Sequence, residues 1–231
     1  MAEVNLLARL PKTNRNIQKR REAQTPENIT VARQYGEAYF DGPREVGYGG
    51  YHYDGRWIPI AEDIINHFRL KPRDRVLDVG CAKGFLVKDL MGACPGIEAF
   101  GLDISEYALR HCELEVVGRL ILGSADALPF PDNSFSAVIS INTIHNFERP
   151  DAVRAVREVE QLAPGRGFIQ VDSYRTHEQR ELFLSWVLTA KFHDYPEGWI
   201  ELFREAGYTG DWYWTILEPQ RKLTGDQVAD R

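Results

Sequence analysis

Short apolar runs alternate with stretches of helical periodicity from residue 75 to about residue 171. Continuous apolar runs are typical of strands that are buried on both faces, and strands that alternate with helices are typical of a parallel sheet. The pattern predicts strands at residues 76–79, 99–102, 119–122, 137–141 and 168–171. We therefore expect an α/β fold with a Rossmann-like, doubly wound and mostly parallel sheet.

Helices are predicted between and after these strands. Residues 84–91, 105–117 and 151–162 have helical spacing of apolar positions, and Ser105 and Asp151 are well placed as N-caps. Later in the chain, helices are predicted at 178–191 and at 197–206, the second ended by Gly207. A further strand is predicted at 212–217.

The segment before the first strand combines helices with an aromatic stretch. A helix is predicted at 26–40, with Thr25 as N-cap and Pro26 at its first position, and a second helix at 58–68. Residues 47–57 contain too much glycine for a regular helix and too many aromatic side chains for a solvated linker. We expect residues 43–57 to close over the sheet as a lid.

The distribution of charged residues indicates a further division of the chain. Its 231 residues, 43% hydrophobic and 27% charged, have the composition of a globular protein. The net charge is −6, yet residues 1–21 carry one acid, Glu3, against the basic residues Arg9, Lys12, Arg15, Lys19, Arg20 and Arg21. We predict a basic, flexible arm at 1–25, N-terminal helices with a Gly/Tyr-rich lid at 26–70, and a core at 71–231 that forms one domain with 26–70.

Several classes of protein are disfavoured by what the sequence lacks. No apolar stretch approaches the roughly 18 residues that a membrane helix needs, and the N-terminus lacks the apolar region of a secretory signal. We therefore expect a cytoplasmic protein. Cys81, Cys94 and Cys112 form no CxxC pair, which indicates reduced thiols and no zinc site.

Carboxylates follow three successive predicted strands. The first strand leads into residues 78–84, Asp-Val-Gly-Cys-Ala-Lys-Gly, whose small residues let a ligand approach the backbone. Asp103 ends the second strand, where it can accept hydrogen bonds from both hydroxyls of a ribose, and Asp126 follows the third, where it can bind an adenine amine. Because the carboxyl ends of parallel strands share one edge of a sheet, the pattern predicts a nucleoside site there.

These motifs and their order resemble the class I S-adenosylmethionine-dependent methyltransferases, in their small-molecule, type 11-like branch, over about residues 75–172. The resemblance implies S-adenosyl-L-methionine as cofactor, with its methionine part at residues 78–84, its ribose at Asp103 and its adenine at Asp126 and Ala127. The expected cofactor-binding residues are Asp78, Gly80, Cys81, Ala82, Gly84, Asp103, Ile104, Asp126, Ala127 and Asn142. Ala82 replaces the family's usual glycine, which suits a tight turn only if its φ is not positive.

The sequence constrains the reaction chemistry and the acceptor less than it constrains the cofactor. His145 follows the fourth strand, where the family places the transferred methyl, and is the candidate general base because histidine titrates near neutral pH. Asp172, after the fifth strand, could hold an acceptor hydroxyl, and no metal is expected. Acceptor contacts are predicted from the aromatic flanks: Tyr35, Tyr39, Tyr48, Tyr51, Tyr53 and Trp57, with Arg56, before the sheet, and Trp186, His193, Tyr195 and Trp199 after it.

Three functions fit these observations. The first is methyl transfer to a small molecule, such as a sugar, a nucleotide-linked sugar or another biosynthetic intermediate. The second is an RNA methyltransferase steered by the basic N-terminal arm, although the rest of the chain is acidic and nucleic acid is not the expected partner. The third is a non-catalytic scaffold that binds the cofactor. A homodimer is compatible with the aromatic flanks.

Overall fold

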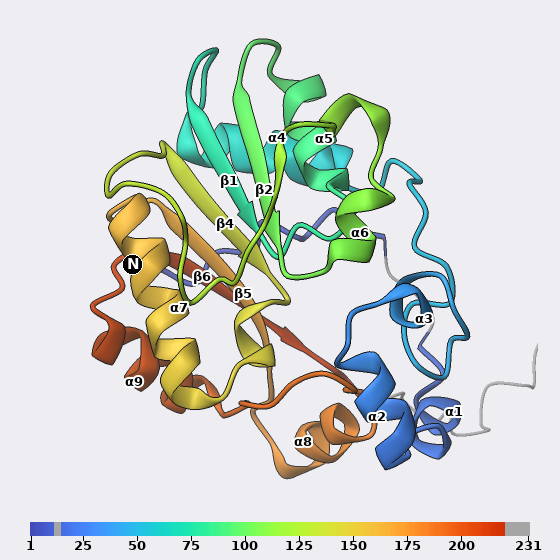
Figure 1. Ribbon diagram of the computed structural model, residues 1–231. Coiled ribbons are helices and arrows are strands. Elements are labelled where there is room, and N and C mark those ends of the chain that lie inside the picture. The colour runs from blue at the N-terminus through green and yellow to red at the C-terminus, as the bar shows by residue number, and fades with distance from the viewer. Residues whose placement is uncertain (12–14, 220–231) are drawn as a thin grey trace, which may run out of the picture.

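A six-stranded sheet, parallel throughout, forms the centre of the protein in a computed structural model that describes residues 1–11 and 15–219. The strand order is β3-β2-β1-β4-β5-β6 (Figure 1). The strands are β1 (Arg75–Val79), β2 (Glu98–Asp103), β3 (Leu120–Leu122), β4 (Ala137–Ile141), β5 (Gly167–Ser173) and β6 (Asp211–Ile216). The predicted doubly wound α/β fold is thus confirmed.

Helices cover both faces of the sheet because successive strand residues point to opposite sides. Val76 packs with α4 (Ile58–Phe68) and α5 (Phe85–Ala93). Leu77 and Val79 pack into the other core with α7 (Arg149–Leu162) and α9 (Pro196–Ala206). Burial on both faces explains why the strands are apolar at nearly every position.

The predicted N-caps fix several helix ends. The Thr25 hydroxyl accepts a hydrogen bond from the Asn28 N–H (3.2 Å) and starts α2 (Pro26–Ala32). The Ser105 hydroxyl accepts from the Ala108 N–H (3.0 Å) and starts α6 (Glu106–Arg110). Gly207, at φ 74°, ends α9 as predicted.

Other predicted boundaries were wrong. The helix expected at 26–40 is divided into α2 and α3 (Glu37–Phe40), because Tyr35 adopts φ 50° and interrupts the helical backbone. The helix expected at 105–117 ends at Arg110 and is followed by a 3-10 turn at Leu114–Val116. The helix expected at 178–191 is α8 (His177–Leu184), and α7 begins at Arg149 with Glu148, not Asp151, as N-cap.

The first residues of the chain lie against the sheet. The Val4 N–H donates to the Trp212 carbonyl (2.8 Å), and the Trp212 N–H donates to the Ala2 carbonyl (3.1 Å), so residues 2–4 cover the free edge of β6. Leu6 is buried, and the Arg9 guanidinium contacts Glu62 and Asp63 of α4. The expected flexible arm is therefore wrong for residues 1–11. Residues 12–14 of that arm, including Lys12, and residues 220–231 of the predicted core lie outside the described residues.

The N-terminal helices dock beside α8. Figure 1 shows α1 (Ile17–Glu22), α2 and α3 grouped in blue next to α8 in orange, at one end of the sheet. Gln24 donates a hydrogen bond to the Val187 carbonyl, and Arg33 Nη2 donates to the Ala190 carbonyl (3.1 Å). Two segments from opposite ends of the chain therefore cover the sheet together.

Candidate active site

The loop after β1 requires glycine at its first position. Gly80 adopts φ 84°, and a Cβ on it would overlap the side chain of Thr143 after β4. The N–H groups of Gly80 and Cys81 both donate to the Leu102 carbonyl, at 2.7 and 3.1 Å. The loop is thus held between β2 and the end of β4, with its backbone open to a ligand.

Ala82 takes a positive φ, the conformation expected to be unfavourable for an alanine in this turn. Its φ is 49°, a left-handed conformation that costs an alanine about 1–2 kcal/mol. The strain is offset locally, because the Ala82 N–H donates to Asp103 Oδ2 at 2.7 Å. The missing glycine therefore leaves the turn intact and adds strain beside the site.

Asp103 connects the first two strand ends. Its Oδ2 accepts from Ala82 and its Oδ1 accepts from the Ser105 N–H (2.8 Å), which fixes the carboxylate plane. Burial raises the pKa of Asp103, and the backbone hydrogen bonds oppose that rise. Each oxygen keeps a lone pair for a ligand hydroxyl.

Two adjoining cavities open at these strand ends. The larger has a volume of about 310 Å³ and the smaller about 60 Å³, and both are bounded by Tyr48, Gly80, Ala82, Ile141 and Asn142. The larger is also lined by Asp103 and by Arg33, Gln34, Tyr35, Tyr39, Phe40, Leu102, Ile104, Gly123, Ser124, Ala125, Thr143, Asn146, Phe147 and Lys191. The smaller is completed by Tyr51, Trp57, Asp78, Cys81 and Leu86.

Asp78 is a buried carboxylate that faces the smaller cavity. Its exposed fraction is 5%, and it makes no hydrogen bond or ion pair with another residue of the described ranges. Burial raises the pKa of Asp78 to about 7, with a further contribution from the negative charge of Asp103. A buried carboxylate without a partner is costly, so a cationic ligand group next to it would be stabilised.

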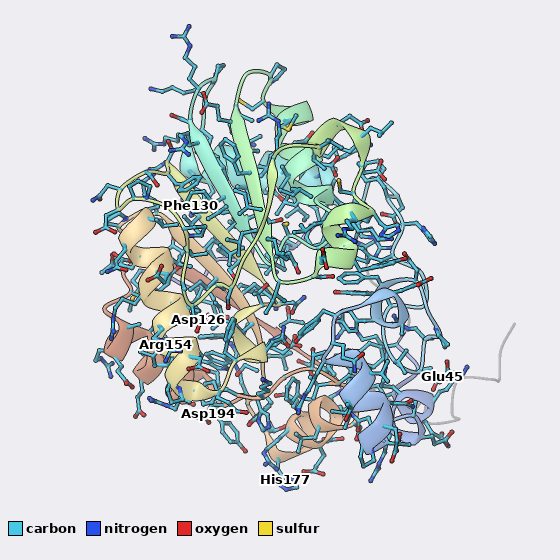
Figure 2. The ribbon with its side chains drawn as sticks, viewed as in Figure 1. Glu45, Asp126, Phe130, Arg154, His177 and Asp194 are labelled. Carbon is cyan, nitrogen blue, oxygen red and sulfur yellow. The ribbon has the colours of Figure 1, made fainter. Side chains whose placement is uncertain are left out.

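The third strand end differs from the expectation. Gly123, Ser124 and Ala125 line the larger cavity, whereas Asp126 and Ala127 do not. The Asp126 carboxylate accepts from the Ser124 hydroxyl and from Arg154 Nη2 (3.0 Å) on α7, and Figure 2 shows Asp126 and Arg154 next to each other. Asp126 thus stabilises the loop after β3 through Ser124 and Arg154 and does not face the cavity. Gly84 lies outside both cavities as the left-handed N-cap of α5.

His145 also lies outside the lining of both cavities. It is buried, its carbonyl accepts from the N–H groups of Lys191 and Phe192, and its Nδ1 faces the Asp172 N–H at 3.4 Å. Burial lowers the pKa of His145, which favours the neutral ring. Its neighbours Asn142 and Asn146 do line the larger cavity. A role for His145 as general base remains a prediction that this position does not support.

The aromatic flanks divide between site and core. Tyr35, Tyr39 and Tyr48 line the larger cavity, and Tyr51 and Trp57 the smaller. Trp199, by contrast, is fully buried in the core. The predicted aromatic lid thus contributes the cavity wall opposite the strand ends.

An ion pair that the sequence did not suggest ties this lid to the loop after β1. Lys83 Nζ contacts Asp41 Oδ2 at 2.7 Å, and Asp41 also accepts from the Tyr51 N–H (3.1 Å) and the Tyr107 hydroxyl (2.8 Å). Arg56, which was predicted among the acceptor contacts, is paired with Asp54 (2.6 Å) and lines neither cavity. No group of three or more metal-ligating side chains occurs within residues 1–11 and 15–219.

Comparisons with known proteins agree with this geometry. The family model described as "Methyltransferase domain" matches residues 77–170. A demethylmenaquinone methyltransferase of Symbiobacterium thermophilum is 26% identical over 201 residues, which cover 71% of this chain and 79% of that protein. A malonyl-[acyl-carrier protein] O-methyltransferase of Methylococcus capsulatus is 29% identical over 170 residues, which cover 71% of this chain but only 58% of that protein.

A solved structure shares the fold. A chain of the complex that contains the Trm112 methyltransferase activator of Haloferax volcanii superposes with a TM-score of 0.52 and 22% identity, covering 64% of this chain and 66% of the other. With the sheet order and the strand-end loops, these findings support a class I S-adenosylmethionine-dependent methyltransferase, with the family domain over residues 77–170. No helix in the described ranges is long and apolar enough to cross a membrane.

The residues present suit S-adenosyl-L-methionine, the cofactor of this class. The unpartnered carboxylate of Asp78 matches the α-ammonium group of the methionine part, and the free lone pairs of Asp103 match the two ribose hydroxyls. Ile104, 58% exposed at the larger cavity, offers an apolar surface for the adenine. Ser124 and Ala125 lie where the sequence pattern had pointed to Asp126 and Ala127.

Proposed function

We propose that the protein transfers the methyl group of S-adenosyl-L-methionine to a small-molecule acceptor at the aromatic end of the larger cavity. The carrying observation is the meeting of two chambers at Gly80, Ala82 and Asn142. Asp78 lines the smaller chamber with Tyr51, and Asp103 lines the larger chamber with Tyr48, so a carboxylate and a lid tyrosine face each chamber. Such an arrangement holds a donor and an acceptor in contact while it excludes water.

The charges of the site indicate how the methyl donor would bind. Asp78 would hold the ammonium group and Asp103 the ribose, and the backbone of residues 80–82 lies between the two carboxylates where the cavities meet. The bound cofactor supplies a methyl group on a sulfonium, which is already a good leaving group. The protein's main contribution is therefore alignment of the acceptor atom with that methyl.

The acceptor side is largely aromatic. Tyr35, Tyr39, Phe40, Tyr48 and Phe147 line the cavity, which suits an acceptor with an apolar or ring-shaped body. Sugars also stack on aromatic rings, so a sugar acceptor stays within this proposal. The two curated relatives described above are named for demethylmenaquinone and for malonyl-[acyl-carrier protein], which supports a small acceptor group without selecting one.

Asn146 is the polar side chain best placed to orient the acceptor. Its Nδ2 donates to the Asn142 carbonyl (3.1 Å), while its Oδ1 is buried without a hydrogen-bond partner in the described ranges. A buried unsatisfied oxygen costs about 1–3 kcal/mol, which an O–H or N–H of the acceptor would recover. This residue, unlike His145, faces the cavity.

The alternatives have less support. An RNA methyltransferase would need a free basic arm, but Arg9 is paired with Glu62 and Asp63, and Lys19 with Glu45. A scaffold that only binds the cofactor would not need the row of aromatic side chains in the larger cavity.

Calorimetry and labelling test the proposal. Full-length protein should bind S-adenosyl-L-methionine and its demethylated product. Asp103→Asn should lower the affinity for both by about 10- to 100-fold, because charge-assisted hydrogen bonds are lost. Asp132→Asn, in an exposed turn, is the matched control and should bind normally. With methyl-labelled cofactor and a cell extract, label should enter the small-molecule fraction. Absence of binding by the unsubstituted protein, or label in RNA, would contradict the proposal.

A further inference from the structure

Three arginines surround one tryptophan at the seam between the N-terminal helices and the segment after α8. The guanidinium carbons of Arg15, Arg20 and Arg44 lie 5.3, 5.1 and 5.6 Å from the centre of the Trp186 ring. A ring has two faces, so at least two of these cations lie on the same side of the indole. Cation–π attraction holds each against the ring but does not remove their mutual repulsion.

None of the three arginines forms an ion pair with a carboxylate in the described part of the chain. Arg20 is buried, with an exposed fraction of 8%, and donates only to the carbonyls of Glu45 (3.4 Å) and Gly47 (3.0 Å). Arg44 donates to the carbonyls of Gly47 (3.2 Å) and Tyr48 (2.7 Å). Burial, and then the charge of Arg44, lower the pKa of Arg20.

The surrounding acids do not balance this charge. Glu45 is already paired with Lys19 (3.3 Å), and Figure 2 shows it beside the N-terminal helices. Burial raises the pKa of Asp172, near the end of β5, more than the charge of Arg15 lowers it, and Asp172 and Arg15 form no ion pair in the described ranges. The neighbourhood thus has four cations and two anions. A buried guanidinium without an anionic partner is an expensive arrangement unless a ligand supplies the anion.

The cluster is connected to the acceptor chamber. The carbonyl that Arg44 binds belongs to Tyr48, whose side chain lines both cavities. Trp186 comes just after α8 in the chain, after Phe183 and before Val187. The Val187 carbonyl accepts a hydrogen bond from Gln24. None of the four side chains of the cluster lines either cavity, so an anion between the arginines would lie outside the chamber, next to the wall that Tyr48 forms.

We infer that Arg15, Arg20 and Arg44, with Trp186, form a binding site for an anionic group of the acceptor, either a carboxylate or a phosphate. The inference rests on the proposed function, because it assigns to the same acceptor an apolar body under the tyrosines and an acidic group at the seam. Guanidinium groups bind both anions through paired N–H donors. A group held there fixes the far end of the acceptor and so orients its other end toward the methyl.

Small anions and arginine substitutions test the site. Phosphate, pyrophosphate and succinate are titrated separately into full-length protein saturated with the demethylated cofactor. At least one of them should bind and raise the melting temperature, since a ligand of the folded state alone stabilises it. The double substitution of Arg15→Gln and Arg44→Gln should weaken binding of that anion by about tenfold or more, because two charge-assisted contacts are lost. Arg21→Gln, on the exposed face of α1, is the control and should bind as the unsubstituted protein does.

The outcomes separate the two proposals. Arg15→Gln alone removes no hydrogen bond of the described structure, so it reports on the anion even if the double variant unfolds. Preference for phosphates over succinate, or the reverse, identifies the acidic group. Failure of all three anions to bind, equal weakening by Arg21→Gln, or tighter binding of an RNA oligonucleotide lost in the same variants would overturn the inference. Failure of the cofactor itself to bind would instead overturn the proposed function.

Discussion

At the scale of single residues, Asp78 links the electrostatics of the site to ligand binding. Its carboxylate is buried, unpartnered within the described structure and raised in pKa from 3.8 to about 7. The folded protein therefore holds a proton that the unfolded chain has already lost. Between pH 4 and 7 the free energy of unfolding of the ligand-free protein falls as pH rises, because the folded state binds more protons.

Cofactor affinity should have the opposite dependence on pH. A cationic ammonium group binds the ionised carboxylate, so below pH 7 each unit of acidification should weaken binding by up to about tenfold, and above pH 7 the affinity should level off. Calorimetric titration of the demethylated cofactor between pH 5.5 and 8.5 measures this. Asp78→Asn should bind weakly and without that slope. An unchanged slope in Asp78→Asn would assign the titration to another group.

A place after a predicted strand indicated residues that line the cavities in some cases, but not for Asp126 or His145. Asp78, Gly80 and Asp103 line them because their positions follow from strand ends alone. Asp126 does not, because its partner Arg154 comes from α7, and only the fold brings the two together. Their contacts with the cofactor remain predictions.

At the scale of elements, the lid depends on the contact between Asp41, at the end of α3, and Lys83, in the loop after β1. Burial of Asp41 alone would raise its pKa, but the bonds from Lys83, Tyr51 and Tyr107 outweigh burial and lower that pKa to about 2. The carboxylate therefore stays ionised at any pH near neutrality. The pair couples lid position to the conformation of the cofactor loop.

Asp41→Asn should make the lid more mobile and also weaken cofactor binding. The substitution leaves Lys83, with an exposed side-chain fraction of 6%, without its anion, and we expect about tenfold weaker binding of the demethylated cofactor. Hydrogen exchange of residues 43–57 should become faster. Asp54→Asn, which breaks only the exposed pair with Arg56 in the same lid, is the matched control. Faster exchange with unchanged affinity would show that the lid does not act through the loop.

Element boundaries were predictable where local chemistry decides them. Residues 58–68 form a helix over the predicted range, and Thr25, Ser105 and Gly207 cap as their residue types indicate. Prediction failed where a tertiary contact overrides periodicity. Tyr35 takes φ 50° although it lies within a helical pattern, and its carbonyl accepts from the Ser105 hydroxyl, a partner 70 residues away.

At the scale of the whole molecule, the N-terminal residues complete the sheet. Removal of residues 2–11 would expose the backbone edge of β6 and remove buried Leu6, whose burial is worth about 1.5–3 kcal/mol. We expect a lower melting temperature and concentration-dependent association of the truncated protein, measured by calorimetry and light scattering. Arg9→Gln, which keeps the edge contacts, should change little. Equal stability of the truncated and full-length proteins would contradict this role.

The pairing of residues 2–4 with Trp212 has a consequence for synthesis on the ribosome. Residues 2–4 are made long before their partner Trp212, and Arg15 and Arg20 are likewise made long before Trp186. Residues 75–142, which carry both donor carboxylates, are complete much earlier. A nascent chain therefore acquires the surroundings of the methyl donor before it can enclose an acceptor, and a later folding step joins residues 2–4 to β6.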